Sequence, residues 1–218
     1  MRENFERCLT EVLRHEGLWS DHPKDPGGAT MKGVTIGTFA QFKGRKVTKA
    51  ELRAISDEDL RAIYRRKYWD VVKGDDLPSG LDFVAFDAAV NSGPSRGAKW
   101  LQQALGVTAD GKVGPATLAA ARATYAPAAI ERAIGFRLAF LQRLKTWPTF
   151  GRGWGRRVEE VRVKALAMAD DRPAATVTPI RPTIAPATKE MQPTKENTEA
   201  TKARPSLWAM IVQMFREN

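Results

Sequence analysis

The chain has 218 residues, 43% of them hydrophobic and 28% charged, which is enough for one good core or two small ones. Its net charge of +10 favours a polyanionic partner, whether nucleic acid, an anionic membrane surface or an anionic cell-wall polymer. The single cysteine, Cys8, excludes an intramolecular disulfide and a cysteine-based metal cluster, and its place in an apolar helical stripe predicts a buried side chain.

The predicted elements are helices almost throughout residues 3–170, so the expected fold class is mainly α. Apolar side chains recur at helical spacing over 3–16, and residues 17–35 then form a glycine-rich stretch with room for a small hairpin. Capping residues, glycines and prolines bound the later helices. These helices are predicted over 35–44, from 48 onward, and over 56–72, 79–91, 94–106, 115–123, 127–146 and 155–169. The sequence "GRGWG" at 151–155 is expected to break the pattern before the last, basic helix.

The composition changes at residue 171. Residues 171–205 are rich in proline, threonine, alanine and lysine and have almost no apolar periodicity. Such a segment cannot bury enough surface to offset its chain entropy, so we expect a disordered linker. Residues 206–218 are apolar again and predict a short C-terminal helix.

The segment from residue 15 to 35 carries an unusual set of polar side chains. It holds both histidines of the chain and three carboxylates. A plain connector between two helices is one interpretation, but long loops inside compact domains are often functional. Glu16 stands at the C-terminal end of the first predicted helix, where the helix dipole disfavours a negative charge. A carboxyl group there can have a raised pKa, which a general acid needs at neutral pH.

A second carboxylate is expected if Glu16 cleaves a glycosidic bond, because such hydrolysis commonly uses two. Asp25 lies nine residues after Glu16 in "DPGGAT", where a proline and two glycines restrict the turn, and we favour it over Asp21. Thr30 follows closely, with a hydroxyl able to orient a water. The predicted catalytic set is therefore Glu16, Asp25 and Thr30.

Two stretches resemble a known family. The stretch "HEGLWSDHPKDPGGATMKGVTIGTF" resembles the signature of the glycoside hydrolase 108 family of bacterial and phage N-acetylmuramidases, close to E-G-G-Y-x-x-x-P-x-D-x-G-G-x-T-x-x-G-I-T. The later "FDAAVNSGPSRGAKWLQQALGVTADGKVGPATLAAA" resembles the peptidoglycan-binding segment that commonly follows it, with N-x-G and D-G-x-x-G-P-x-T blocks. Together the resemblance covers roughly residues 5–165.

The resemblance implies a lysozyme-like fold and cleavage of the glycan between N-acetylmuramic acid and N-acetylglucosamine. It also implies that Glu16 is the proton donor. We accordingly divide the chain into a catalytic region (1–92), a peptidoglycan-binding helical region packed with it (93–170), the linker (171–205) and the tail helix (206–218). Similarity to the E-x8-D-x5-T pattern of phage lysozymes favours inversion, although lytic transglycosylation is an open alternative.

The sequence departs from the family signature at three places. Leu18 replaces the second glycine of E-G-G, Trp19 replaces the tyrosine, and Met31 replaces the asparagine that commonly follows the threonine. Trp19 keeps an aromatic ring and is a candidate substrate-binding residue. Thr30 stands one residue early relative to phage lysozymes, so its role carries over less directly than that of Glu16.

Four more residues are candidate substrate-binding groups. Tyr68 and Trp69 have rings that could stack on sugars, but aromatic residues at the end of a helix more often pack in a core. Asn91, with Asp87 one helical turn before it, is a polar residue on an apolar helix. Such a pair needs partners if it is buried, so it either ties the helix to the loop within residues 15–35 or touches glycan. His15, next to Glu16, orients the site or caps the helix end.

The sequence does not favour a metal site or a cofactor. His15 and His22 are the only histidines, and the only cysteine is expected to be buried, so too few ligands are available for a zinc site. We expect no nucleic-acid partner, because no binding motif is recognisable and the basic residues are spread along the chain. We expect a monomer whose partner is peptidoglycan. A secretion-assisting or wall-binding protein with little catalysis is the alternative.

The apolar tail predicts a second partner. A helix over 206–218 would be about 20 Å long, too short for a hydrocarbon core of about 30 Å. Its composition favours reversible attachment to the inner-membrane surface or to a membrane-embedded protein such as a holin, with docking on the chain's own surface as the alternative. The N-terminus has no apolar signal-peptide region, so we expect a protein that is cytoplasmic until released and acts on the cell wall in the periplasm.

Overall fold

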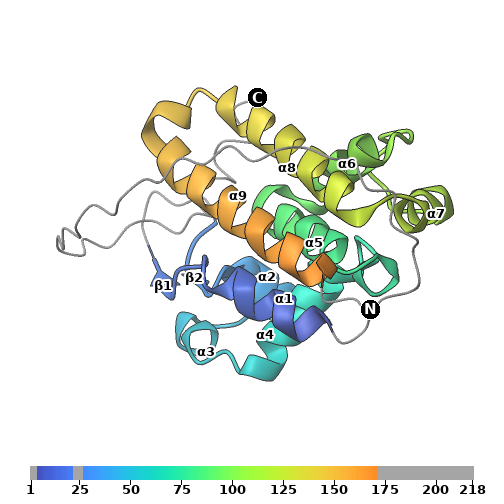
Figure 1. The fold of residues 1–218 in the computed structure, drawn as a ribbon. Helices are drawn as coiled ribbons and strands as arrows, with labels where there is room; N and C mark the ends of the chain where they lie inside the picture. The colour runs from blue at the N-terminus through green and yellow to red at the C-terminus, as the bar shows by residue number, and fades with distance from the viewer. Residues whose placement is uncertain (1–3, 22–26, 171–218) are drawn as a thin grey trace.

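The structure is a computed structural model that describes residues 4–21 and 27–170 (Figure 1). The predicted linker (171–205) and tail helix (206–218) lie outside the described residues, and so do Asp25 and His22. The described part is mainly helical, as predicted. Its helices are α1 (Asn4–Leu13), α2 (Ile36–Lys43), α3 (Lys49–Arg53), α4 (Asp57–Tyr64), α5 (Leu81–Ser92), α6 (Pro94–Leu105), α7 (Pro115–Ala123), α8 (Ala126–Gln142) and α9 (Trp147–Asp170).

A small antiparallel sheet lies in the segment where a hairpin was predicted. It has three two-residue strands in the order β1 (Trp19–Ser20), β2 (Thr30–Met31) and β3 (Val34–Thr35). The β2–β3 connection is the two-residue loop Lys32–Gly33, and both residues have positive φ, 46° and 77°. Such φ values are typical of the type I′ turn, whose twist matches that of the paired strands. The sheet therefore turns back tightly beside the end of α1 (Figure 1).

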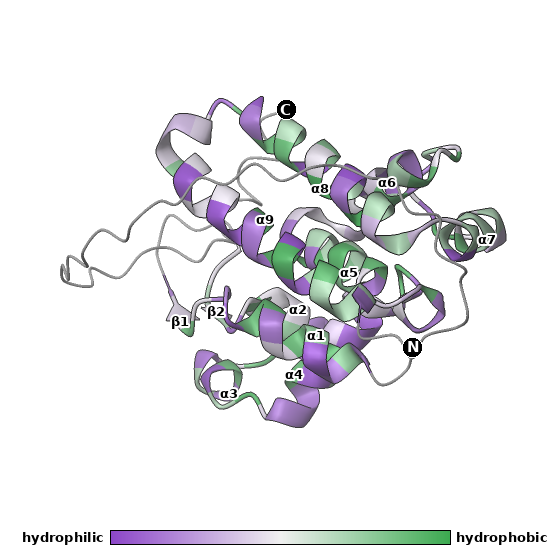
Figure 2. Ribbon diagram, in the orientation of Figure 1, coloured by the Kyte–Doolittle hydropathy of each residue, from purple (hydrophilic) through white to green (hydrophobic). Residues whose placement is uncertain are grey.

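Helix α5 is the centre of the fold. All twelve of its residues are buried, and it contacts α1, α6, α8 and α9. Figure 2 shows the visible face of α5 largely apolar, whereas α1 carries both apolar and polar residues. Gly80, just before α5, has φ +85°, and a Cβ there would lie 2.3 Å from the carbonyl oxygen of Ala165 in α9. Glycine therefore allows the start of α5 to pack directly on α9.

Two helix predictions were wrong in detail. The helix predicted over 56–72 is α4 followed by a π-helical turn, η1 (Arg65–Trp69), and a short 3-10 turn, η2 (Gly74–Asp76), comes after it. Helix α9 begins at Trp147 and runs through "GRGWG" without a break. The three glycines of this segment cost about 3 kcal/mol in a helix, whereas burying Trp154, Val158 and Val161 on the same helix contributes about 1.5–3 kcal/mol for each side chain. Gly151 also leaves room for the ring of Trp147, which a Cβ would approach to 2.5 Å.

One apolar core runs through the described residues. Its buried side chains form a single cluster that extends from Phe5 in α1 to Ala169 in α9. The residues predicted as a catalytic region and a binding region therefore share this core. Within the described ranges, no helix is both long enough and apolar enough to span a lipid bilayer.

Cys8 is fully buried in the core, as its helical pattern predicted. Burial raises the pKa of its thiol well above the usual range. We predict that a thiol-reactive chromophore labels native protein only through unfolding, whereas it labels one thiol per chain in guanidinium chloride. The Cys8→Ala variant supplies the background. Fast stoichiometric labelling of the native protein would contradict this placement of α1.

Candidate functional site

Glu16 lies in the turn that ends α1. The amide of His15 donates to the carbonyl of Val12 (3.0 Å), and the amide of Glu16 donates to that of Leu13 (3.2 Å). This turn directs the Glu16 side chain inward, and only 2% of it is exposed. The sequence prediction of a carboxyl group at the end of the first helix is confirmed. Its near-complete burial is a property of the tertiary structure.

A buried ionic network holds this carboxyl group. Arg157 of α9 donates through Nη1 to Oε1 of Glu16 (3.1 Å) and through Nε and Nη2 to Oδ1 of Asp87 in α5 (3.1 and 2.8 Å). Arg137 of α8 donates to Oδ2 of Asp87 (2.5 Å) and to Oδ1 of Asn91 (3.1 Å). The network therefore joins the end of α1 to α5, α8 and α9.

The second oxygen of Glu16 faces the β2–β3 turn. Among the described residues, Oε2 of Glu16 has no hydrogen-bond partner. A Cβ on Gly33 would lie 3.0 Å from this oxygen and 2.4 Å from the hydroxyl of Tyr64, which donates to the carbonyl of Lys32 (2.9 Å). The absence of a side chain at Gly33 therefore lets the β2–β3 turn pack closely against the buried oxygen that Arg157 does not hold.

The pKa values of the two carboxyl groups in the network are shifted in opposite directions. Burial raises the pKa of Glu16, and the charge and hydrogen bond of Arg157 oppose this rise only in part. Burial also acts to raise the pKa of Asp87, but the charges of Arg157 and Arg137 hold it well below its ordinary value. Asp87 is thus an ionised structural anchor, whereas the raised pKa of Glu16 favours the protonated form that a general acid needs.

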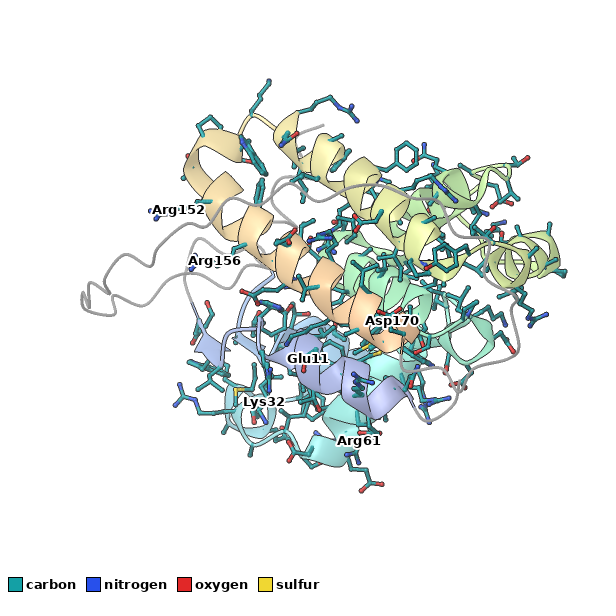
Figure 3. The ribbon with its side chains drawn as sticks, in the orientation of Figure 1. Glu11, Lys32, Arg61, Arg152, Arg156 and Asp170 are labelled. Carbon is teal, nitrogen blue, oxygen red and sulfur yellow. The ribbon has the colours of Figure 1, made fainter. Side chains whose placement is uncertain are left out.

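His15 lies at a basic groove beside this network. The groove has a volume of about 420 Å³ and is lined by Arg14, His15, Gly153, Arg156, Arg157 and Glu160. Burial, followed by the charge of Arg157, lowers the pKa of His15, and its Nε2 lies 3.6 Å from Glu160. Figure 3 shows Arg152 and Arg156 projecting from the first half of α9, at the end of the molecule that carries the sheet. The groove therefore offers cationic side chains next to Glu16.

Trp19 and Asp21 line a second groove. It has a volume of about 440 Å³, and Lys49, Ala50, Arg53 and Ala54 complete its lining. The guanidinium carbon of Arg53 lies 4.3 Å from the centre of the half-buried Trp19 ring. Asp21 accepts a hydrogen bond from Lys49 (3.0 Å). Trp19 thus lines a surface groove, whereas Asp21 is part of a surface ion pair.

Thr30 is buried in β2. Its hydroxyl donates to the carbonyl of Gly28 (3.2 Å), and its backbone pairs with Ser20 and Thr35. Asp25, the third residue of the predicted catalytic set, lies in the range 22–26, outside the described residues.

Three predicted substrate-binding residues are core residues here, which corrects their assignment. Trp69 has no exposed surface, packs edge-on against Phe5 and Phe86, and donates through Nε1 to Asp75 (3.0 Å). Tyr68 is buried beside Tyr64, with ring centres 5.6 Å apart. The apolar surface of these rings is more stable in the core than in water, so they are not available to stack on sugars.

Asn91 is the third of these residues. It is buried and accepts the hydrogen bond from Arg137, so it belongs to the ionic network and not to a glycan contact. The interpretation that the Asp87 and Asn91 pair ties its helix to the loop is wrong about the partner. The partners are α8 and α9, not the loop.

Sequence reasoning missed Arg157 and Arg137. The basic composition of the last predicted helix favours a solvated face, yet Arg157 stands on the buried stripe of α9 next to Trp154, Val158 and Val161. Arg137 similarly follows Ile130 and Ile134 on the buried stripe of α8. A basic residue on an apolar helix face, combined with the unpartnered Asp87, was the available signal.

The D-G-x-x-G-P-x-T block folds into a turn held by Gln102. The amide Nε2 of Gln102 donates to Asp110 (2.7 Å), to the carbonyl of Lys112 (3.0 Å) and to Thr117 (3.2 Å). Its Oε1 accepts from the amide of Gly111 (2.8 Å). The block therefore has a structural role in joining α6 to α7. Over the described ranges, no three histidine, cysteine or acidic side chains gather as a metal site.

Two family models match the chain in sequence order. The model described as glycosyl hydrolase 108 matches residues 9–93, and the model described as a predicted peptidoglycan domain matches residues 96–159. No curated protein matches the chain. Among solved structures, that of Brucella abortus SagA is 46% identical with a TM-score of 0.71, and the match covers 78% of this chain and 98% of the SagA chain. The chain therefore belongs to the glycosyl hydrolase 108 family, as a glycoside hydrolase that acts on peptidoglycan.

Proposed function

We propose that the chain is an N-acetylmuramidase that cuts between N-acetylmuramic acid and N-acetylglucosamine, with Glu16 as the general acid. The observation that carries the proposal is the Glu16 carboxyl group itself. It lies in the part of the chain that matches the hydrolase family, it is buried with a raised pKa, and Oε2 has no hydrogen-bond partner among the described residues. A general acid needs this combination of a retained proton and an oxygen from which to donate it.

The proposed reaction begins with proton transfer from Glu16 to the glycosidic oxygen. Because Arg157 holds Oε1, the proton resides on Oε2, beside Gly33. Asp25 then activates a water or stabilises the oxocarbenium-like state, and Thr30 helps to place that water. We favour inversion of the anomeric carbon, as in phage lysozymes.

The charge of the protein supports an anionic polymer as substrate. The net charge is +10, and the groove beside Glu16 adds Arg14 and Arg156 to the surface near the reacting carboxyl group. We propose that this groove attracts the carboxylates of the peptides attached to muramic acid. Weak, screened interactions of this kind raise the local substrate concentration more than they fix its orientation.

Replacing Glu16 by glutamine tests the acid. Glu16→Gln keeps the shape of the side chain and removes the proton, so lysis of permeabilised cells should fall by about 10²-fold or more. Circular dichroism and thermal unfolding verify the fold. Mass spectrometry of the muropeptides released by the wild type should find reducing muramic acid ends. Anhydro ends would identify a lytic transglycosylase, and a folded variant with more than a tenth of the wild-type rate would exclude Glu16 as the acid.

Replacing the two aspartates tests the second carboxylate. Asp25→Asn should lower the lytic rate far more than Asp21→Asn, because Asp21 only pairs with Lys49 at the surface and such pairs contribute about 0–1 kcal/mol. Initial rates at saturating substrate, with both variants at equal concentration, provide the comparison. The reverse order would show that Asp21 is the second carboxylate.

Adding a methyl group at Gly33 tests the close packing of the β2–β3 turn against Oε2 of Glu16. The control is Gly44→Ala, because Gly44 has a similar φ (+67°) and a Cβ there would meet nothing within 4 Å. Both variants should lose about 1 kcal/mol of stability through the strained backbone. Only Gly33→Ala should also lower the lytic rate, by about 10-fold or more, because its methyl group displaces the carboxyl group or Tyr64. Equal rates for the two folded variants would contradict the proposed position of the acid.

A further inference from the structure

We propose that Arg157 is a positioning residue for Glu16, so that the segment matched as a peptidoglycan domain completes the catalytic site of the hydrolase segment. The inference rests on the proposed role of Glu16 as general acid. Glu16 and Asp87 lie in the hydrolase segment (9–93), whereas Arg137 and Arg157 lie in the peptidoglycan segment (96–159). The second segment would then do more than bind substrate.

The guanidinium group of Arg157 has little freedom to move. All three of its nitrogens donate to buried carboxylates, two of them to Asp87 and one to Glu16. Its side chain is 3% exposed, and those of Asp87 and Glu16 are 0% and 2% exposed. The guanidinium group is planar, so when Asp87 holds its Nε and Nη2, the direction of Nη1 is fixed as well. Arg157 therefore presents Nη1 to Glu16 at a constant place.

Asp87 is itself held by a second arginine. Arg137 donates to the oxygen of Asp87 that Arg157 does not use, and it is anchored in turn by Asn91. The chain of contacts thus runs from α8 through α5 to α9 and ends at Glu16. Since no described residue donates to Oε2 of Glu16, Arg157 is the only described side chain that orients this carboxyl group by a hydrogen bond.

The charges of the network explain why this contact matters for proton transfer. With Glu16 ionised, two arginines face two carboxylates and the network is neutral; with Glu16 protonated, it carries one positive charge. Burial stabilises the protonated acid before transfer, and Arg157 stabilises the carboxylate that remains afterwards. The acid can therefore both hold its proton and release it.

The other polar and titratable groups around the site are uncharged or distant from the carboxyl group. Tyr64 of α4 has a pKa raised well above its usual value, first by burial, and is neutral at working pH. His15, with a lowered pKa, is neutral at pH 7 and faces Glu160 of α9. Lys32 contributes a carbonyl group that accepts from Tyr64. The pH response of Glu16 thus depends mainly on Arg157 and, behind it, on Asp87 and Arg137.

The test compares substitutions that move the protonation of Glu16 in opposite directions. Arg157→Gln removes the cation, so the alkaline limb of the pH–rate profile should move up by about 1–3 pH units while kcat falls by about 10²-fold. Asp87→Asn removes the anion that competes with Glu16 for Arg157, so the alkaline limb should move to lower pH. Arg157→Lys retains a charge without the fork and should lose rate with a smaller movement of the limb. Arg162→Gln removes the two surface ion pairs that this residue of α9 makes with Glu131 and Glu159, and it should change neither kcat nor the position of the alkaline limb.

Carbon-13 NMR titration of the Glu16 carboxyl group in the same variants gives a readout independent of lysis. Activity in Glu16→Gln would defeat the proposed function, whereas the NMR pKa would still show whether Arg157 controls this carboxyl group. If Arg157→Gln does not fold, Arg157→Lys and Asp87→Asn provide the comparison. A folded Arg157 variant with the wild-type kcat and an unmoved Glu16 titration, or an upward movement in Asp87→Asn, would overturn the proposal.

Discussion

One guanidinium group, that of Arg157, lies between the buried carboxyl groups of Glu16 and Asp87, and the packing of the helices around it depends on keeping this cation and the Asp87 carboxylate paired. Removing one partner from a buried ion pair costs about 3–5 kcal/mol, a large part of the stability of a domain of this size. Asp87 must therefore lie within reach of α8 and α9, and the end of α1 must bring Glu16 to the same place. The ionic network constrains four helices at once.

The same constraint joins fold and chemistry. A carboxyl group buried without a cation would hold its proton too firmly to donate it, and one fully paired in water would not hold it at neutral pH. Glu16 lies between these limits, because one oxygen faces Arg157 and the other faces the β2–β3 turn. The two family segments meet at this residue, and their buried side chains form one core.

Much of the helical framework could be predicted from local sequence. Thr35 caps α2 by accepting from Thr38, the capping box of Thr48 and Glu51 starts α3, and Gly106 ends α6 in the left-handed conformation. Each of these signals acts over three or four residues, so the sequence contains them in full. Local reasoning was wrong where distant contacts decide the outcome. Helix α9 continues through its glycines because Trp154 is buried against the rest of the molecule.

The sequence by itself determined the mainly helical framework, the position of Glu16 at the end of the first helix and the buried state of Cys8, since these follow from short-range periodicity. Only the tertiary structure decided which charges meet. Glu16 and Arg157 are 141 residues apart, and Asp87 and Arg157 are 70 apart, so no local pattern relates them. Their contact arises because burying the apolar faces of α5, α8 and α9 brings these polar residues into a common interior, where each charge must find a partner.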